Sequence, residues 1–218
     1  MAIVDLSHPV GHGTITYPGL PGPEISDHLS RVESRQRYAE GYEFQIGRIE
    51  MVTNTGTYLD TPFHRFADGH DLTGLALERV ADVPGVAIDA TGEAEAGPEL
   101  LDGVDVAGRA VLFRTGWDAH WGTERYGEPG HPWVAVATAE RLVAAGAAVV
   151  GIDSLNIDDT RCGERPTHTA LLAAGIPIVE HLTGLDALGQ QPFRFFAVPP
   201  AIEGLGTFIV RAFALTER

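Results

Sequence analysis

Four side chains that can bind metals or move protons lie close together in the stretch VTNTGTYLDTPFH, which runs from Val52 to His64. They are the amide of Asn54, the phenol of Tyr58, the carboxylate of Asp60 and the imidazole of His64. A carboxylate and an imidazole can hold a divalent metal or take a proton from water, and a phenol can donate a hydrogen bond to a developing oxyanion. The stretch is therefore the first candidate for a catalytic site.

The backbone conformation decides whether these groups meet. If residues 52–60 are extended, side chains two positions apart share a face, and the amide, the phenol and the carboxylate point the same way. Gly56 would then leave room for a ligand or an ion, and Pro62 would end the strand so that His64 folds back towards that face. The alternative is a surface loop with a capping carboxylate and a solvated imidazole, because Asn, Gly and Asp are also turn residues. The local sequence leaves both alternatives open.

A second group of polar side chains follows a predicted buried strand in the segment VVGIDSLNID. Asp153 and Asp158 come at the end of this strand, His168 opens a predicted helix, and Glu180 ends the next strand. Strand ends in α/β folds project side chains into a cleft, so His168 and Glu180 can converge on one site. Taken singly, His168 is more often a residue of a helix N-terminus, and Glu180 a carboxylate in water.

Short apolar runs bounded by glycine or proline predict the strands that must position these groups. They cover residues 2–6, 44–59, 83–89, 109–115, 147–152, 176–180, 193–198 and 207–213. Two helices are predicted at residues 137–145 and 167–174, each followed by a glycine suited to a helix C-terminus. Residues 10–23 are too rich in proline and glycine for a helix and predict a loop that shapes a pocket. The fold class is α/β, a mixed sheet or partly closed β-barrel flanked by a few helices, in one domain over residues 1–218.

Composition excludes several classes of partner. The chain has 218 residues, of which 30 are acidic and 15 basic, for a formal net charge of -15. Phosphate backbones and anionic membranes need clustered basic residues, so we expect neither a nucleic acid nor a membrane as partner. Cys162 is the only cysteine, which excludes an internal disulfide and fits a reducing compartment, and no signal-peptide pattern is present. We expect a cytoplasmic protein that acts on a small molecule.

Five segments in the same order resemble the cyclase-like hydrolase family, which includes bacterial kynurenine formamidase and isatin hydrolase. They are DLSHPV, NTGTYLDTPFHRFADG, VLFRTGW, VVGIDSLNID and HTALLAAGIPIVEHLTGL, and they span nearly the whole chain. The resemblance implies a fold of the swivelling β/β/α type and hydrolysis of a C–N bond in a small amide, formamide or lactam, with arylformamidase activity in tryptophan catabolism as one example. It also implies a homodimer or homotetramer whose pocket is partly lined by a neighbouring subunit.

The family pattern HxGTHxDxPxH, followed much later by a histidine and a glutamate, implies roles for individual residues. By resemblance, Asp60, His168 and Glu180 correspond to metal ligands and His64 to the catalytic histidine. The two histidines spaced four apart are replaced by Asn54 and Tyr58, so that the motif reads NTGTYLD. An amide oxygen is a neutral donor, and a phenol must lose a proton, at a reference pKa of about 10, to bind a metal well. We therefore expect no tight two-metal site.

Three interpretations follow from this departure. In the first, one divalent metal, Mn or Zn, binds through Asp60, His168 and Glu180 with help from Asn54, and His64 activates water. In the second, the enzyme uses no metal: Tyr58 stabilises the oxyanion, and His64 paired with Asp60 is the base. In the third, the chain is a non-catalytic binding protein for small molecules on the same fold. We favour a hydrolase, because four residues of the pattern occur together.

Other residues receive smaller predictions. Phe63 and Phe66 flank His64 and are candidates for stacking on a planar substrate, and Trp117 is a candidate for the pocket wall, although all three are equally suited to core packing. His8 and His12 are expected to be solvated loop histidines. Cys162 lacks a sequence signature for a nucleophile, so we expect no catalytic role for it.

Overall fold

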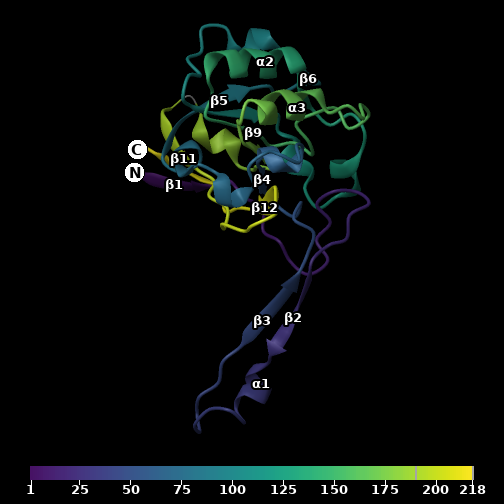
Figure 1. The fold of residues 1–218 in the computed structure, drawn as a ribbon, viewed down its shortest axis with the longest axis vertical. Coiled ribbons are helices and arrows are strands. Elements are labelled where there is room, and N and C mark those ends of the chain that lie inside the picture. Colours follow the sequence, from purple (N-terminus) through teal and green to yellow (C-terminus); the bar gives the residue numbers. More distant parts are fainter. Residues whose placement is uncertain (190, 218) are drawn as a thin grey trace.

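The structure is a computed structural model that describes residues 1–189 and 191–217. Its centre is a mixed sheet in the order β1-β13-β11-β5-β7-β9-β10-β4-β12 (Figure 1). The strands are β1 (Ala2–Asp5), β4 (Tyr58–Asp60), β5 (Val83–Asp89), β7 (Ala110–Arg114), β9 (Val149–Ile152), β10 (Ile178–Glu180), β11 (Phe193–Phe196), β12 (Thr207–Ile209) and β13 (Phe213–Thr216). Neighbours from β5 to β10 are parallel and the other pairs antiparallel.

Alternating side chains of the central strands fill two cores on opposite faces of the sheet. On β7, Val111 and Phe113 pack with residues of the helices, whereas Ala110 and Leu112 pack with residues of β1's end, β11 and β13 on the other face. This period of two is what an extended chain buried on both sides requires. The α/β class with a mixed sheet and few helices is confirmed. β1 pairs with β13, and the single domain over residues 1–218 stays a prediction.

Two helices cover one face of the sheet (Figure 1). They are α2 (Val136–Ala145), which ends at Gly146 with φ +75°, and α3 (Pro166–Ala173), which begins with a proline. Both agree with the predicted ranges to within a residue, because Gly146 ends α2, and Pro166 and Gly175 bracket α3. Two short strands, β6 (Glu95–Ala96) and β8 (Trp133–Val134), pair in parallel at the edge of this layer. None of the helices described is long and apolar enough to span a membrane.

A hairpin of residues 24–50, which we call the arm, projects away from the sheet (Figure 1). It consists of β2 (Glu24–Leu29), α1 (Arg31–Ser34) and β3 (Ile46–Glu50), and its strands are exposed except for Leu29 at the end of β2. The prediction of one strand over residues 44–59 is therefore wrong. The chain leaves β3 at Glu50, turns, and enters the sheet only at β4.

Gly56 lies in this turn and shows why the stretch is not extended. Its φ is +67°, a conformation that favours glycine. A Cβ on Gly56 would lie 2.5 Å from Cγ2 of Val10. The glycine therefore makes room for Val10 of the first loop, and the expectation that it leaves space for a ligand is wrong. Residues 207–213 likewise form two strands, β12 and the start of β13, where one strand was predicted.

Candidate functional site

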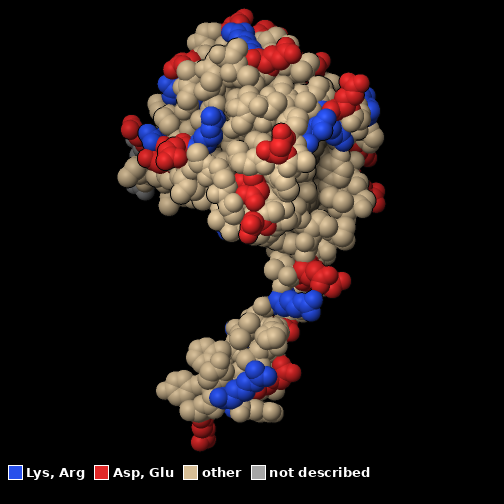
Figure 2. Space-filling view, viewed as in Figure 1, with Lys and Arg blue, Asp and Glu red and all other residues tan. Residues whose placement is uncertain are grey.

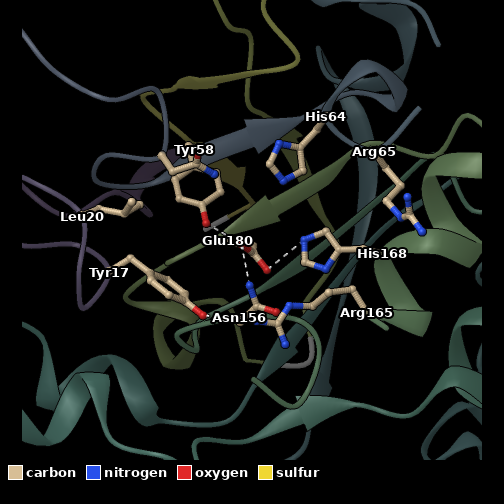
Figure 3. A pocket seen from close by; sticks show the side chains of 10 residues that line it. Tyr17, Leu20, Tyr58, His64, Arg65, Asn156, Arg165, His168 and Glu180 are labelled. Atoms are coloured by element: carbon tan, nitrogen blue, oxygen red, sulfur yellow. Dashed lines mark hydrogen bonds and ion pairs between the residues drawn. The ribbon is translucent and has the colours of Figure 1, made fainter. Parts of the chain in front are cut away.

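A cavity of about 350 Å³ opens where β4, β10 and the start of α3 meet (Figure 3). Its lining comes from five parts of the chain: the first loop, the segment before and within β4, the turn after β4, the segment from β9 to α3, and the end of β10. The residues are Tyr17, Leu20, Asn54, Tyr58, His64, Arg65, Asn156, Arg165, His168 and Glu180. The two polar clusters of the sequence thus converge on one cavity.

Strand pairing brings Asp60 and Glu180 together at the base of the cavity. With His168 they form what we call the cavity floor. In the antiparallel pair of β4 and β10, Tyr58 lies opposite Glu180. His168 Nε2 lies 3.8 Å from Asp60 Oδ2 and 3.5 Å from Glu180 Oε1. Asp60 is 0% and Glu180 1% exposed, so the alternatives of a surface loop at Asp60 and of a Glu180 carboxylate in water are wrong. Donor atoms of Asp60, His64 and His168 all lie within 4.8 Å of one another.

Asp158 fixes the orientation of His168. Its Oδ2 lies 2.6 Å from His168 Nδ1, and its carboxylate also accepts the backbone N–H groups of Thr167 and His168 at the start of α3. The other ring nitrogen, Nε2, is thereby turned towards Asp60 and Glu180. Burial alone would lower the pKa of His168, but the charges of Glu180, Asp158 and Asp60 outweigh it and raise the pKa to about 10. Without a metal, His168 is therefore an imidazolium at neutral pH.

Thr207 links Asp60 to His64. It lies opposite Asp60 in the pair of β12 and β4, and its hydroxyl donates to Asp60 Oδ1. The same oxygen lies 2.8 Å from His64 Nδ1. Because the hydroxyl proton is directed to Asp60, Nδ1–H of His64 completes the contact as donor, which leaves Nε2 of His64 as acceptor. Gly206 supports this arrangement, since a Cβ there would lie 2.3 Å from the backbone nitrogen of His64.

The donor set on the floor fits a divalent metal. Asp60 Oδ2 is buried and has no hydrogen-bond partner among the described residues. Burial raises the pKa of Asp60, but His64 and His168 outweigh it and hold the pKa below its ordinary value, so the group is a carboxylate. Carboxylates and imidazoles suit Zn and Mn, and a histidine whose other nitrogen donates to a carboxylate is the common arrangement at such sites. Asp60, His64 and His168 therefore form a candidate metal site, and Glu180 lies beside it, 3.5 Å from His168 Nε2.

Tyr58 closes the side of the floor where the family pattern has a histidine. Its hydroxyl donates to Glu180 Oε2 at 2.6 Å, as Figure 3 shows. Burial, followed by the charges of Glu180 and Asp60, raises the pKa of Tyr58 well above its ordinary value, so the phenol keeps its proton. The side chain of Asn54 lies beside this hydroxyl. Tyr58 and Asn54 thus face each other at the cavity, and the role of Asn54 as a metal ligand stays a prediction.

The aromatic residues predicted to bind substrate lie outside the lining of the cavity as described. Phe66 packs against the helix-side core, and Phe63 is exposed to solvent. The Trp117 indole N–H donates to the carbonyl of Tyr126, and its ring packs edge-on against His120. These interactions favour packing for Phe66 and Trp117, and their roles in substrate binding stay a prediction. Tyr17 and Leu20 of the first loop form the apolar wall instead.

His8 is also placed differently from the prediction. Its ring stacks on Trp121 with the centroids 4.1 Å apart, and burial lowers the pKa of His8 to about 4. It is therefore not a solvated loop histidine. His12 accepts the backbone N–H of Ile25 at the start of the arm.

The sequence matches the model of the Cyclase family, described as "Putative cyclase", over residues 4–159, well over half of the chain. The chain belongs to the cyclase family. Among curated relatives, the kynurenine formamidase of Bacillus cereus is 26% identical over 215 residues, which cover 96% of this chain and 95% of that protein. The kynurenine formamidase of Erythrobacter litoralis is 28% identical over 205 residues, 90% of this chain and 86% of that protein.

Solved structures of the cyclase family share the fold. Isatin hydrolase A from Ralstonia solanacearum superposes with a TM-score of 0.82 at 23% identity, covering 99% of this chain and 92% of that one. A structure described as a potential metal-dependent hydrolase with cyclase activity gives a TM-score of 0.80 at 23% identity, covering 100% and 98%. The resemblance to the cyclase-like family is confirmed. Its motif is altered at the two positions of Asn54 and Tyr58.

Proposed function

We propose that this cyclase-family protein is a hydrolase that cleaves the C–N bond of a small amide, formamide or lactam with the help of one divalent metal ion. The observation that carries the proposal is the convergence of Asp60 Oδ2, buried without a partner, with His168 Nε2 and Glu180 Oε1 on the cavity floor. The relatives named kynurenine formamidase support a hydrolase of this class.

Each floor residue has a distinct part in the proposed reaction. Asp60, His168 and Glu180 would hold the metal, Mn or Zn, which when bound polarises a carbonyl and lowers the pKa of a water molecule. His64 takes the proton of the attacking water at Nε2, because Thr207 engages its Nδ1. Tyr58 donates a hydrogen bond on the opposite side of the floor. We propose one metal and not two, because Asn54 and the protonated Tyr58 are poor replacements for two imidazoles.

Metal titration of the purified protein tests this proposal. Calorimetry with Mn and with Zn, after chelation and buffer exchange, should give one equivalent bound, and hydrolysis of formanilide or of a lactam should return with that equivalent. The proposal fails if millimolar metal does not bind, or if the bound protein hydrolyses no amide in a panel of formamides, anilides and lactams.

A metal-free enzyme is the second candidate, and the buried phenol of Tyr58, which keeps its proton, favours it. In this candidate the one O–H of Tyr58 turns from Glu180 to the oxyanion, and His64 with Asp60 serves as the base. This candidate predicts amide hydrolysis that survives chelation and falls by about 100-fold in Tyr58→Phe. A third candidate, a non-catalytic binding protein, predicts ligand binding without turnover under both conditions.

We also propose that the arm binds a second copy of the chain. Large apolar side chains on it are exposed, namely Ile25, Val32, Tyr38, Tyr42, Phe44, Ile46 and Ile49. Figure 2 shows the arm as a narrow extension that carries both signs of charge between uncharged residues. A two-stranded hairpin is marginally stable by itself, and mixed charges let two such arms approach. Sedimentation equilibrium should give at least twice the mass of 23.3 kDa, and a monomer at micromolar concentration would contradict the proposal.

We also propose a cytoplasmic location, a part in tryptophan catabolism and a small-molecule substrate. A cytoplasmic location is favoured by the single cysteine, and a part in tryptophan catabolism by the kynurenine formamidases among the relatives. A small-molecule substrate is favoured by the size of the cavity, about 350 Å³.

A further inference from the structure

The lining of the cavity carries both signs of charge. Its floor holds the buried carboxylates of Asp60 and Glu180, and its lining also includes two arginines, Arg65 and Arg165. Figure 3 shows these arginines on either side of His168. Neither has a carboxylate oxygen within 4.0 Å in the part of the chain that the structure describes. Among the other described arginines, eight pair with carboxylates, namely Arg35, Arg48, Arg109, Arg114, Arg141, Arg161, Arg194 and Arg211, whereas Arg31, Arg37, Arg79 and Arg125 do not. Arg65 and Arg165 differ from these four in lining the cavity, where their charges are available to an anion that enters it.

Arg165 is held in place by groups that do not neutralise it. Its Nη1 donates to the carbonyl oxygens of Asp159 at 2.9 Å and Cys162 at 2.8 Å, and its Nη2 lies 3.4 Å from the hydroxyl of Tyr17. Its backbone has φ +52°, a conformation that residues with a Cβ rarely adopt. The loop before α3 thus fixes the guanidinium against the cavity with its positive charge available.

Arg65 presents the other guanidinium from the turn after β4. Only its Nε has a hydrogen-bond partner among the described residues, Oγ1 of Thr169 at 3.2 Å. The two terminal nitrogens are free to form the parallel pair of hydrogen bonds that a carboxylate accepts from arginine. Arg65 and the proposed base His64 line the same cavity, so an anion bound to Arg65 shares that cavity with the base.

We propose that Arg65 and Arg165 form a carboxylate-binding subsite, and that the substrate is an amide which carries a carboxylate. The inference rests on the proposed function, whose substrate class it narrows. The floor carboxylates repel an anion, whereas the arginines attract it, so the charged end stays near the arginines. The amide carbonyl is then directed to the floor. Substrate orientation is set by this difference in charge.

Binding of two isosteric ligands tests the subsite without turnover. Benzoate and benzamide have the same size and differ in charge, and calorimetry in the presence of chelator avoids binding of benzoate to a metal. We expect benzoate to bind at least about 10-fold more tightly than benzamide, as a charge-assisted pair of hydrogen bonds implies. Arg65→Gln, a change at an exposed side chain, should remove most of this preference, and Arg165→Gln should lower it as well.

Arg79→Gln is the matched control, because Arg79 lies outside the cavity lining, has no carboxylate partner among the described residues and changes the net charge equally. It should leave the preference for benzoate unchanged. Equal binding of benzoate and benzamide, failure of both to bind at millimolar concentration, or a preference that survives Arg65→Gln and Arg165→Gln would each overturn the subsite.

Turnover separates this inference from the proposed function. The metal-loaded protein should hydrolyse 2-formamidobenzoate with a higher kcat/KM than formanilide, and Arg65→Gln should narrow the ratio mainly through KM. Hydrolysis of both compounds at equal efficiency, with equal binding of benzoate and benzamide, would overturn the subsite and leave the hydrolase intact. A benzoate preference that depends on Arg65, in a protein that hydrolyses neither compound, would support the subsite and overturn the hydrolase.

Discussion

The cavity floor and the arm depart from the usual distribution of residues in opposite directions. On the floor, Asp60, His168 and Glu180 are buried together, although charged groups seldom leave water. On the arm, Val32 and Phe44 are more than half exposed, although large apolar side chains prefer an interior. Each departure costs free energy in the isolated chain, which a bound partner would offset. The partners that we propose differ between the two regions: a cation and a small molecule for the floor, and protein surface for the arm.

Removing one floor carboxylate should have the largest effect. Asp60→Asn deletes the charge that faces His168 and His64, so we expect metal affinity to fall by more than about 100-fold and amide hydrolysis by about 1000-fold. Calorimetry with Mn and steady-state kinetics measure the two losses. Asp186→Asn, at an exposed aspartate outside the cavity lining, should change neither. Full metal affinity in Asp60→Asn would show that metal binding does not require the carboxylate of Asp60.

Changing the arm should break assembly and leave the floor intact. The double substitution of Phe44 and Ile49 to Ser removes two exposed apolar side chains, and we expect the self-association constant to fall by about 100-fold, since buried interface anchors contribute about 1–2 kcal/mol each. Sedimentation velocity measures the association. Val198→Ser, at an equally exposed apolar residue outside the arm, is the control. Unchanged association in the double variant would assign the interface to another surface.

A methyl group added at Gly206 should displace the backbone of His64 and thereby disturb the cavity floor. The added Cβ would press on the backbone of His64, so Gly206→Ala should lower the free energy of unfolding by about 1–3 kcal/mol, as overpacking does, and reduce hydrolysis. Urea denaturation measures the stability. Gly163→Ala is the control, because no atom lies within 4 Å of its added Cβ. Equal stability of the two variants would mean that this backbone contact is not tight.

The smallest expected effect is a dependence of the free energy of unfolding on pH in the metal-free protein, caused by the protonation of His168. The folded pKa of His168, about 10, lies above its unfolded value of about 6.5, so the folded state holds the extra proton between these limits. The contribution of His168 to stability is complete below pH 6.5 and is lost as the pH rises through about 10, with a slope of at most about 1.4 kcal/mol per pH unit. Urea midpoints in chelator at pH 6, 8 and 9.5 measure it. A flat profile, or an identical slope in His168→Gln, would refute the assignment.

The same contrast explains which features the sequence predicts. The central strands follow from their apolar runs, since β7 and β9 are buried on both faces, and the floor residues Asp60, His64, His168 and Glu180 follow from the family pattern. The sequence did not predict the arm because β2 and β3 have no buried face. A strand without a buried face does not show the alternation of apolar and polar residues from which strands are predicted. Apolar residues in β3 were instead joined to those of β4.

Contacts between residues that are far apart in the sequence also could not be predicted from local sequence patterns. Thr207 reaches Asp60 only through the register of β12 against β4, and the two residues are 147 positions apart in the sequence. Asp158 is visible as a carboxylate after a strand, but its bond to His168 depends on how the loop before α3 folds back. The burial of His8 depends on Trp121, which lies in another segment. Such contacts are set by tertiary packing, which single-sequence periodicity does not contain.

The pairing of β1 with β13 has a consequence for how the chain folds during synthesis. Ala2 pairs with Thr216, so β1 has no strand partner until β13 has been made. The floor waits almost as long, because Thr207 joins Asp60 only when β12 has left the ribosome. At about 5–20 residues per second, β4 would spend several seconds without its outer neighbour, and contacts so far apart in sequence slow folding further. The arm is complete by Glu50 and can form early, so a newly made chain carries its exposed apolar hairpin before it has an active site.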